Sequence, residues 1–159
     1  MAAGVVEGAQ AALLDLDLVA KLTLQEARHL IVATDGAILL LDEESGALAN
    51  LAAFGDELPA LNGLSRGVGI IGSVVASGVG EIVNDVVGDA RRVHAVIEVR
   101  SLVCAPLKVG EKVIGAIVLA STLPMAYEAR ELKLLSTLAL QTATAIENGR
   151  LYRQLHLKA

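Results

Sequence analysis

Aromatic residues are nearly absent from this chain of 159 residues: it has no tryptophan, one phenylalanine (Phe54) and two tyrosines (Tyr127 and Tyr152). The core must therefore be built from leucine, valine, isoleucine and alanine. The 13 lysines and arginines are outnumbered by 18 aspartates and glutamates, which gives a formal net charge of −5. Nucleic acid is thus not an expected partner, because nucleic-acid binding relies on a basic surface and usually on aromatic stacking.

The chain also lacks paired cysteines and long apolar runs, and a secretory signal is not expected. Its single cysteine, Cys104, excludes an intrachain disulfide and a multi-cysteine zinc site. Although 54% of the residues are hydrophobic, no uninterrupted run reaches the roughly 18 to 20 residues that span a bilayer. Residues 1–8 have no basic segment ahead of an apolar stretch. We expect a soluble, cytoplasmic protein without a membrane partner, folded as one domain over residues 1–159.

Two amphipathic helices are predicted at the ends of the chain. The first, over residues 7–31, carries apolar residues at steps of three and four and a second apolar flank at Leu14, Leu18 and Leu22. The second, over residues 128–155, has a seam with a period of 3.5 residues and another flank at Leu134, Leu138 and Ala145. Helices that are apolar on two sides need two partners, such as a sheet and a second subunit. The two primary stripes are Leu13, Leu16, Ala20, Leu24, Ala27 and Ile31, and Leu132, Leu135, Ala139, Thr142, Ile146, Gly149 and Arg153.

Between the helices, residues 37–120 are predicted to form a sheet interrupted by a glycine-rich crossover. The expected strands are 37–41 and 47–54 as one hairpin, 81–84, and 101–107 and 113–120 as a second hairpin. Short helices are expected at 70–76 and 89–97. This order of elements predicts an α+β domain whose antiparallel sheet has both terminal helices on one face.

The motif from Gly67 to Gly72 matches GxGxxG, and Asp85 lies at a distance that imitates a ribose-binding carboxylate. A dinucleotide-binding fingerprint must follow a buried strand directly and open a long helix. Here residues 61–66 precede the motif, and Gly78 ends the next segment after a few residues. We interpret the glycines as a tight turn over the sheet.

Three histidines are dispersed without metal-ligand spacing, so no metal site is expected: His29, His94 and His156. Cys104 lies between Val103 and Ala105 in a predicted strand, where it is either a small buried hydrophobe or a nucleophile that lacks a neighbouring base.

Residues 84–94 form the densest polar cluster inside the apolar middle of the chain. Asp89 could cap the helix that follows, with Arg91 and Arg92 in solvent. Alternatively, the segment covers the sheet, and Arg91, Arg92 or His94 donates hydrogen bonds to an anionic or polar ligand.

Four segments in this order resemble a GAF domain, a small-molecule sensory module related to PAS domains. The glycine turn and helix at 66–75 and the crossover Asn84-Asp85 with Asp89-Ala90-Arg91 are similar to family motifs. So are the hairpin at 100–119 and the terminal helix at 134–152.

The resemblance implies a sheet of about six antiparallel strands, with the first and last helices on one face and a ligand pocket under the crossover on the other. It also implies a homodimer through the terminal helices and an effector, such as a histidine kinase, in cis or in trans. The candidate ligand-binding residues are Ser73, Asn84, Asp85, Arg91, Arg92, His94, Ser101 and Cys104. The cofactor is unknown.

This sequence differs from the residues that family members of known ligand use for binding, and the differences restrict which ligands are expected. Members that bind cyclic nucleotides carry Asn-Lys and then Phe, Asp and Glu, whereas this chain has no Asn-Lys, and Tyr127, Glu131 and Leu132 stand at the last three positions. Bilin-binding members need a cysteine in the crossover, and members that reduce free methionine sulfoxide use cysteines upstream of the central strand. This chain has neither. Haem binding through His94 is another alternative.

We therefore expect a non-enzymatic regulatory domain in signal transduction, which binds a small cytosolic ligand and relays the change through dimerising terminal helices. The alternatives are a dimerisation scaffold with a closed pocket and a domain that binds a cyclic nucleotide. An enzyme that uses Cys104 is a further hypothesis.

Overall fold

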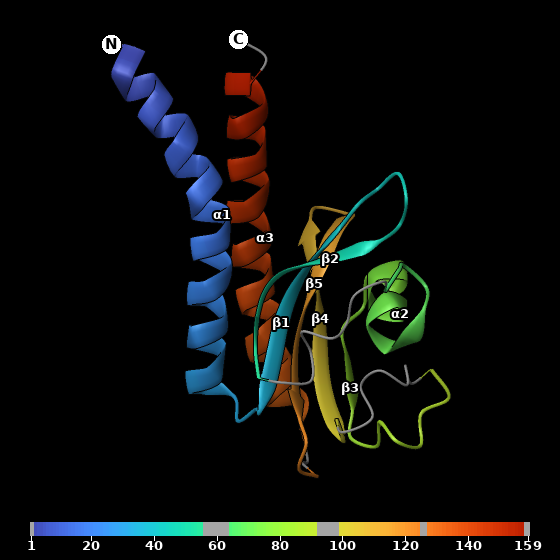
Figure 1. Ribbon diagram of the computed structural model, residues 1–159. Coiled ribbons are helices and arrows are strands. Elements are labelled where there is room, and N and C mark those ends of the chain that lie inside the picture. Colours follow the sequence, from blue (N-terminus) through green and yellow to red (C-terminus); the bar gives the residue numbers. More distant parts are fainter. Residues whose placement is uncertain (1, 56–63, 92–98, 125–126, 158–159) are drawn as a thin grey trace.

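A computed structural model describes residues 2–55, 64–91, 99–124 and 127–157, and it describes side chains from residue 16 onwards except at 153, 156 and 157. Three helices and five strands follow one another along the chain (Figure 1). They are α1 (Ala2–Leu30), β1 (Asp35–Leu41), β2 (Leu48–Phe54), α2 (Gly69–Ser77), β3 (Glu81–Val83), β4 (Ser101–Val109), β5 (Lys112–Ser121) and α3 (Ala129–Leu157). No described helix is both long enough and apolar enough to cross a membrane.

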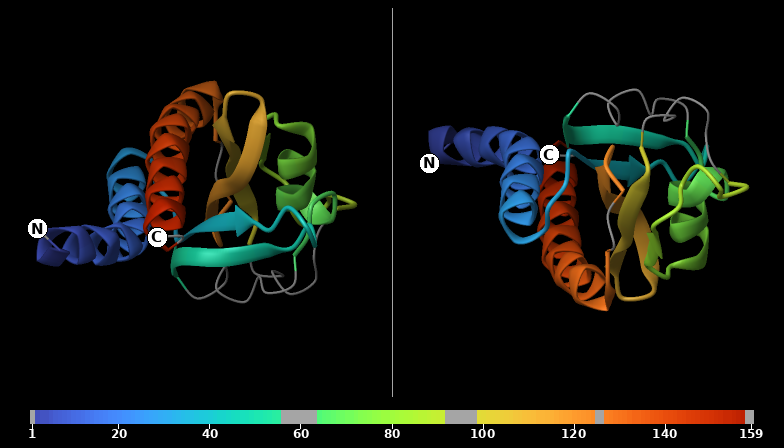
Figure 2. Two further views of the ribbon diagram at one scale, coloured as in Figure 1. Left: turned by 90° about the horizontal axis from the view of Figure 1, so that it is seen from above. Right: turned by 90° about the horizontal axis from the view of Figure 1, so that it is seen from below.

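The strands form one antiparallel sheet in the order β2-β1-β5-β4-β3. Helices α1 and α3 lie side by side on one face of this sheet, and α2 lies on the other (Figures 1 and 2). The predicted α+β architecture is confirmed, and the two terminal helices begin and end within a few residues of the expected positions.

The expected strand count needs a small correction, because the described residues form five strands in place of about six. The residue patterns had indicated five strands, and the sixth came from the resemblance. Beside the β1–β2 turn, the described residues after position 63 form an isolated bridge between Ala47 and Ser65. The backbone then turns at Gly67, whose φ is 86°, and leads into α2.

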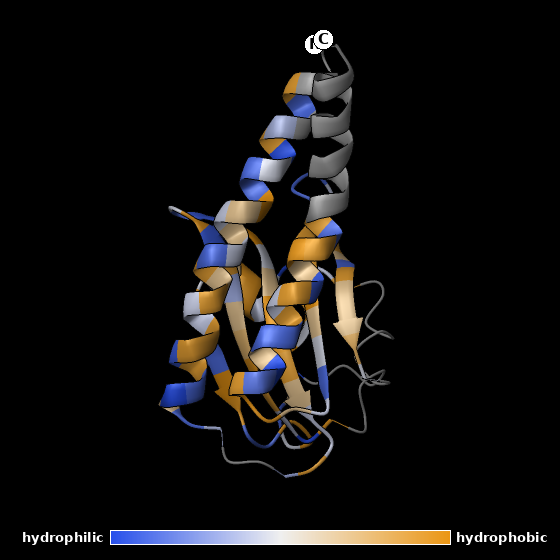
Figure 3. Ribbon diagram, turned by 90° about the vertical axis from the view of Figure 1, so that its left-hand side faces the viewer, coloured by the Kyte–Doolittle hydropathy of each residue, from blue (hydrophilic) through white to orange (hydrophobic). Residues whose placement is uncertain are grey.

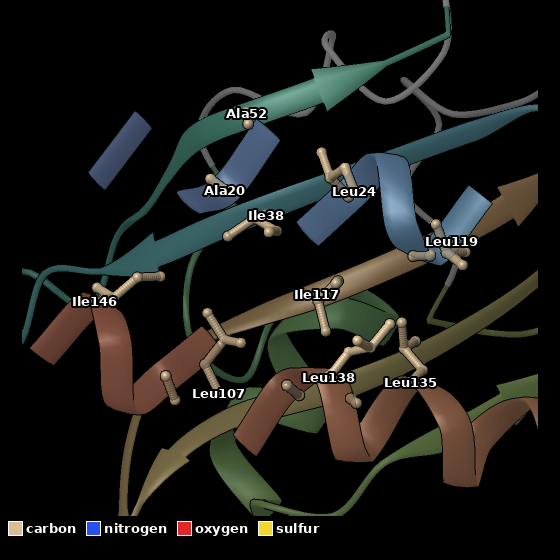
Figure 4. Close-up of a cluster of buried hydrophobic side chains, with 14 of the residues drawn as sticks. Ala20, Leu24, Ile38, Ala52, Leu107, Ile117, Leu119, Leu135, Leu138 and Ile146 are labelled. Atoms are coloured by element: carbon tan, nitrogen blue, oxygen red, sulfur yellow. The ribbon is translucent and has the colours of Figure 1, made fainter. Parts of the chain in front are cut away.

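Each face of the sheet has its own hydrophobic cluster. Alternation along β4 sends Val103, Ala105 and Leu107 toward the terminal helices and Leu102 and Cys104 toward α2. The cluster on the helix side is completed by residues of α1 and α3 at helical spacing (Figure 4). These residues are Leu16, Ala20, Leu24 and Ala27 of α1, and Leu135, Leu138, Ala139, Ala143 and Ile146 of α3.

The second apolar face of α3 differs from the prediction. Leu138 is buried in the monomer and Leu134 packs partly against the same cluster, because α3 contacts both α1 and β4 and so buries a wide stripe. Among the described side chains of α3, the exposed leucines are Leu140, Leu151 and Leu155. On α1 the predicted second flank is exposed at Leu18 and Leu22.

A pair of threonine hydroxyls joins α1 to α3 inside this apolar cluster. The Oγ1 atoms of Thr23 and Thr142 are 3.1 Å apart, and the Thr142 hydroxyl donates to the carbonyl oxygen of Leu138 at 2.7 Å. A hydroxyl has one hydrogen to donate, so Thr23 is the donor to Thr142. Both side chains are buried.

Replacing Thr142 with valine should lower the free energy of unfolding by about 1–3 kcal/mol, because the buried Thr23 hydroxyl loses its acceptor. The double variant Thr23→Val/Thr142→Val should recover part of this loss, since no unpaired hydroxyl then remains in the interface. Urea unfolding measures both effects. Thr137→Val is the matched control, because the exposed Thr137 also donates to a carbonyl of α3, that of Lys133. Equal losses in the single and double variants would contradict the assignment.

Candidate functional site

The described candidate residues lie on α2, on β4 and along the crossover from β3 to β4. Ser73 is on α2, Asn84 and Asp85 directly follow β3, and Arg91 ends the described part of the crossover. Ser101 and Cys104 are on β4. Arg92 and His94 are outside the described residues, as is most of the helix expected at 89–97.

The glycine motif is a turn followed by a close contact. Gly67 and Gly69 have positive φ angles of 86° and 74°, and a Cβ at Gly72 would collide with the carbonyl oxygen of Ser65. Helix α2 is nine residues long, and residues 64–66, the described residues directly before the motif, contain an isolated bridge at Ser65 in place of a regular strand. The interpretation of these glycines as a structural turn is therefore confirmed, and a dinucleotide site has no support here.

The sheet face beneath α2 is aliphatic. Leu39, Cys104 and Val118 from the strands are fully buried against Ile71 and Val74 of α2. A polar ligand would lose its hydrogen bonds to water on such a surface and gain none from these side chains. Ser73 adds no donor toward the sheet, because its Oγ donates to the Gly69 carbonyl of its own helix at 2.7 Å.

The thiol of Cys104 belongs to this aliphatic face. Burial raises the pKa of Cys104 far above its usual range, and the nearby carboxylate of Glu81 adds to the shift. The side chain is thus a neutral thiol at physiological pH, inside the core and away from solvent. These are the properties of a structural cysteine rather than of an activated nucleophile.

Arg91 ties the crossover to the edge strand β3. Its Nη1 and Nη2 atoms donate to the two carboxylate oxygens of Glu81 at 2.9 and 3.1 Å. Its Nε and Nη2 atoms also donate to Asp89, at 3.1 and 3.0 Å. These bonds hold the pKa of the Asp89 carboxyl below its usual range and that of Arg91 above it. The guanidinium predicted to meet a ligand is therefore already engaged by two carboxylates.

Asn84 makes a two-point contact with Tyr127, the residue two positions before α3. Its Nδ2 donates to the Tyr127 carbonyl and its Oδ1 accepts from the Tyr127 amide, each at 3.0 Å. The phenol of Tyr127 continues the chain of contacts, because it donates to the Val32 carbonyl at 2.7 Å. Ser101 donates to the Asn84 carbonyl at 3.3 Å, while Asp85 accepts from the Gly88 amide at 3.1 Å in a local turn.

The structure thus brings Asn84 and Ser101 together at the end of β3, with Asp85 directly after Asn84 in the chain. It separates them from Cys104, which belongs to the aliphatic cluster, and from Ser73, whose hydroxyl is bonded within α2. Sequence reasoning missed the structural role of Tyr127. One signal was available: a tyrosine buried in a core poor in aromatics needs a partner for its hydroxyl. Across the part of the chain that the structure describes, no group of three or more His, Cys, Asp or Glu residues is arranged to hold a metal ion.

Comparisons with known proteins identify the fold. The family model described as GAF domain matches residues 14–147. The GAF domain of a phosphoenolpyruvate-protein phosphotransferase from Coxiella burnetii is similar, with a TM-score of 0.76 and 17% identity, covering 92% of this chain and 94% of that one. A domain of a putative two-component sensor histidine kinase from Sinorhizobium meliloti 1021 has a TM-score of 0.68 and 23% identity, covering 83% and 90%. No curated protein matches the sequence significantly.

Enzymes are also among the solved neighbours, and they correct one expectation. Free methionine-R-sulfoxide reductase from Neisseria meningitidis has a TM-score of 0.74 and 21% identity to this chain, covering 92% of it and 87% of the reductase. We had expected a domain without enzymatic activity. That expectation is wrong as an inference from the fold, because this fold also serves as an enzyme scaffold.

The phenol of Tyr127 makes stability sensitive to alkaline pH. Burial raises the pKa of Tyr127 to about 12, above the value of about 10 in an unfolded chain. Its contribution is therefore complete below about pH 10 and is lost as the pH rises toward 12. In urea unfolding at pH 8, 10 and 11.5, Tyr127→Phe should show a smaller alkaline loss than the wild type. A Tyr127→Phe profile that follows that of the wild type at all three pH values would contradict this assignment.

Proposed function

Because this chain belongs to the GAF domain family, we propose that it is a regulatory domain in signal transduction, whose terminal helices form a homodimer and relay its state to an effector. The family and the similarity to a domain of a putative sensor histidine kinase support a sensory or regulatory role. The observation that carries the proposal is that α1 and α3 both have apolar side chains exposed to solvent.

The two helices are longer than the sheet that supports them. Each has 29 residues, about 44 Å of helix, whereas the longest strand has ten residues, about 33 Å. Both project past the sheet at the end where the two termini lie (Figure 1). A helical pair of this kind provides a surface for a second pair.

Exposed leucines lie on these helices, away from the sheet. Leu18 and Leu22, one turn apart on α1, are 51% and 53% exposed, and Leu155 of α3 is 71% exposed. Figure 3 views the molecule from the side on which α1 and α3 lie, and apolar residues recur on both helices there. A second copy related by two-fold symmetry would cover these side chains in a four-helix bundle.

The wild-type protein should be a dimer at tens of micromolar, and Leu18→Glu/Leu22→Glu should be a monomer, because two carboxylates would lose their hydration in the interface. Light scattering coupled to size exclusion measures the mass. Leu123→Glu is the matched control: Leu123 is 62% exposed but lies in the connection from β5 to α3. A monomeric wild type, or a dimer that survives the double change, would overturn this part of the proposal.

A second candidate function is binding of a small, largely apolar molecule between α2 and the sheet. Positive-φ glycines lie at both ends of α2, Gly69 at the start and Gly78 after its last residue, and they set how the helix lies over the sheet. The aliphatic face beneath it matches an apolar ligand. A cyclic nucleotide is disfavoured, because its phosphate needs donors and those of Arg91 are engaged.

Octanol should shift the methyl resonances of Val74 and Val118, which line this face, and leave Ile117 unchanged, because Ile117 of β5 points to the opposite face. Cyclic AMP and cyclic GMP should shift none of the three. Titrations followed by methyl NMR make the comparison. Shifts with the cyclic nucleotides would contradict the apolar ligand class, and an unresponsive face would favour the closed dimerisation scaffold.

A further inference from the structure

Three segments that are distant in sequence meet at one end of the sheet. They are the start of the crossover at Asn84, the residue two positions before α3 at Tyr127, and the exit from α1 at Val32. Figure 1 shows this end opposite the projecting ends of the two helices. The contacts between these segments are hydrogen bonds between named atoms, so each can be removed by a single substitution.

The contact between Asn84 and Tyr127 depends on the chemistry of a carboxamide. One planar group donates to the Tyr127 carbonyl and accepts from the Tyr127 amide, both at 3.0 Å. Aspartate at this position could accept but not donate, and alanine could do neither. The backbone just ahead of α3 is therefore held to the end of β3 by two bonds that require this residue type.

Tyr127 extends the connection to the other terminal helix. Its side chain is 4% exposed and packs in the cluster that α1 and α3 share. Its hydroxyl donates to the Val32 carbonyl, two residues beyond the end of α1. A single residue thus contacts the crossover through its backbone and the exit from α1 through its side chain.

The described crossover is fixed at its far end as well. Arg91 binds Glu81 of β3 with two hydrogen bonds, at 2.9 and 3.1 Å, and Asp89 binds Arg91 in turn. Residues 84–91 therefore form a loop tied to β3 at one end and to Tyr127 at the other. Hydrogen bonds through Tyr127 thus connect this loop to the segment just before α3 and to the exit from α1.

We propose that Asn84 and Tyr127 form a mechanical link that couples the crossover to α1 and α3. The crossover borders the face assigned above to a ligand, so the link would carry a change there to the helices. This inference rests on the proposed function only where it gives the coupling a role in relaying ligand binding to the terminal helices. The coupling itself is a property of the isolated chain.

The test is a double-mutant cycle read by hydrogen exchange, with the full chain. Arg91→Ala frees the far end of the crossover without touching the link. It should speed exchange about fivefold in residues 128–133 and in residues 32–34, the change expected when about 1 kcal/mol of protection is lost. In an Asn84→Ala background, Arg91→Ala should cause no further increase in those two segments.

Two comparisons keep the test decisive. Among the contacts of the described residues, Asp85→Ala removes the bond to the Gly88 amide, so it should speed exchange locally at 86–88. Asn84→Asp keeps the acceptor for the Tyr127 amide and replaces Asn84→Ala if the latter does not fold. The proposal is overturned if Arg91→Ala leaves 128–133 unchanged, or if its effect persists without the Asn84 amide, because coupling would then run through the sheet. Light scattering on the same samples tests dimerisation separately.

Discussion

The central hairpin β4–β5 is the constraint on which the rest of this structure depends. Both of its faces are buried, and residues alternate between the cluster under α2 and the cluster under α1 and α3. Gly115 of β5 leaves no room for a side chain, because a Cβ there would collide with the carbonyl oxygen of Leu39 on β1. With almost no aromatic residues, the packing is achieved by many aliphatic side chains of similar size. Only the single backbone layer of β4 and β5 therefore separates the cluster under α2 from the cluster under α1 and α3.

The elements with a regular hydrophobic period could be predicted from the sequence. The stripe through Leu16, Ala20, Leu24 and Ala27 identified α1, and the two runs around Cys104 and Ile117 identified the central hairpin, because local alternation decides which face a residue takes. Leu138 was placed on the wrong face of α3. Periodicity shows that a helix has apolar faces, but the width of the buried face depends on how many neighbours the helix has, which here are α1 and β4.

The candidate site was less predictable, because its contacts depend on strand register and on backbone groups. Nothing in the sequence pairs Arg91 with Glu81, since their contact requires β3 to run along the sheet edge beside the returning crossover. Asn84 was identified as a polar residue of interest, but its partners are the amide and carbonyl of Tyr127, 43 positions away. Backbone groups are the same at every residue, so side-chain patterns carry no information about such a contact. Membership of the family likewise fixes the fold and leaves the chemistry to individual residues.

The hydroxyl pair between α1 and α3 also limits how these helices can move. The aliphatic contacts around Thr23 and Thr142 have no direction and could form again after one helix slides along the other. The hydrogen bond could not, because a slide by one turn, about 5.4 Å, would leave two buried hydroxyls apart. Thr23 would then have no acceptor in the interface, at a cost of about 1–3 kcal/mol. The two helices are thus held against axial sliding, and tilting or rotating the pair as one body is the movement that keeps this bond.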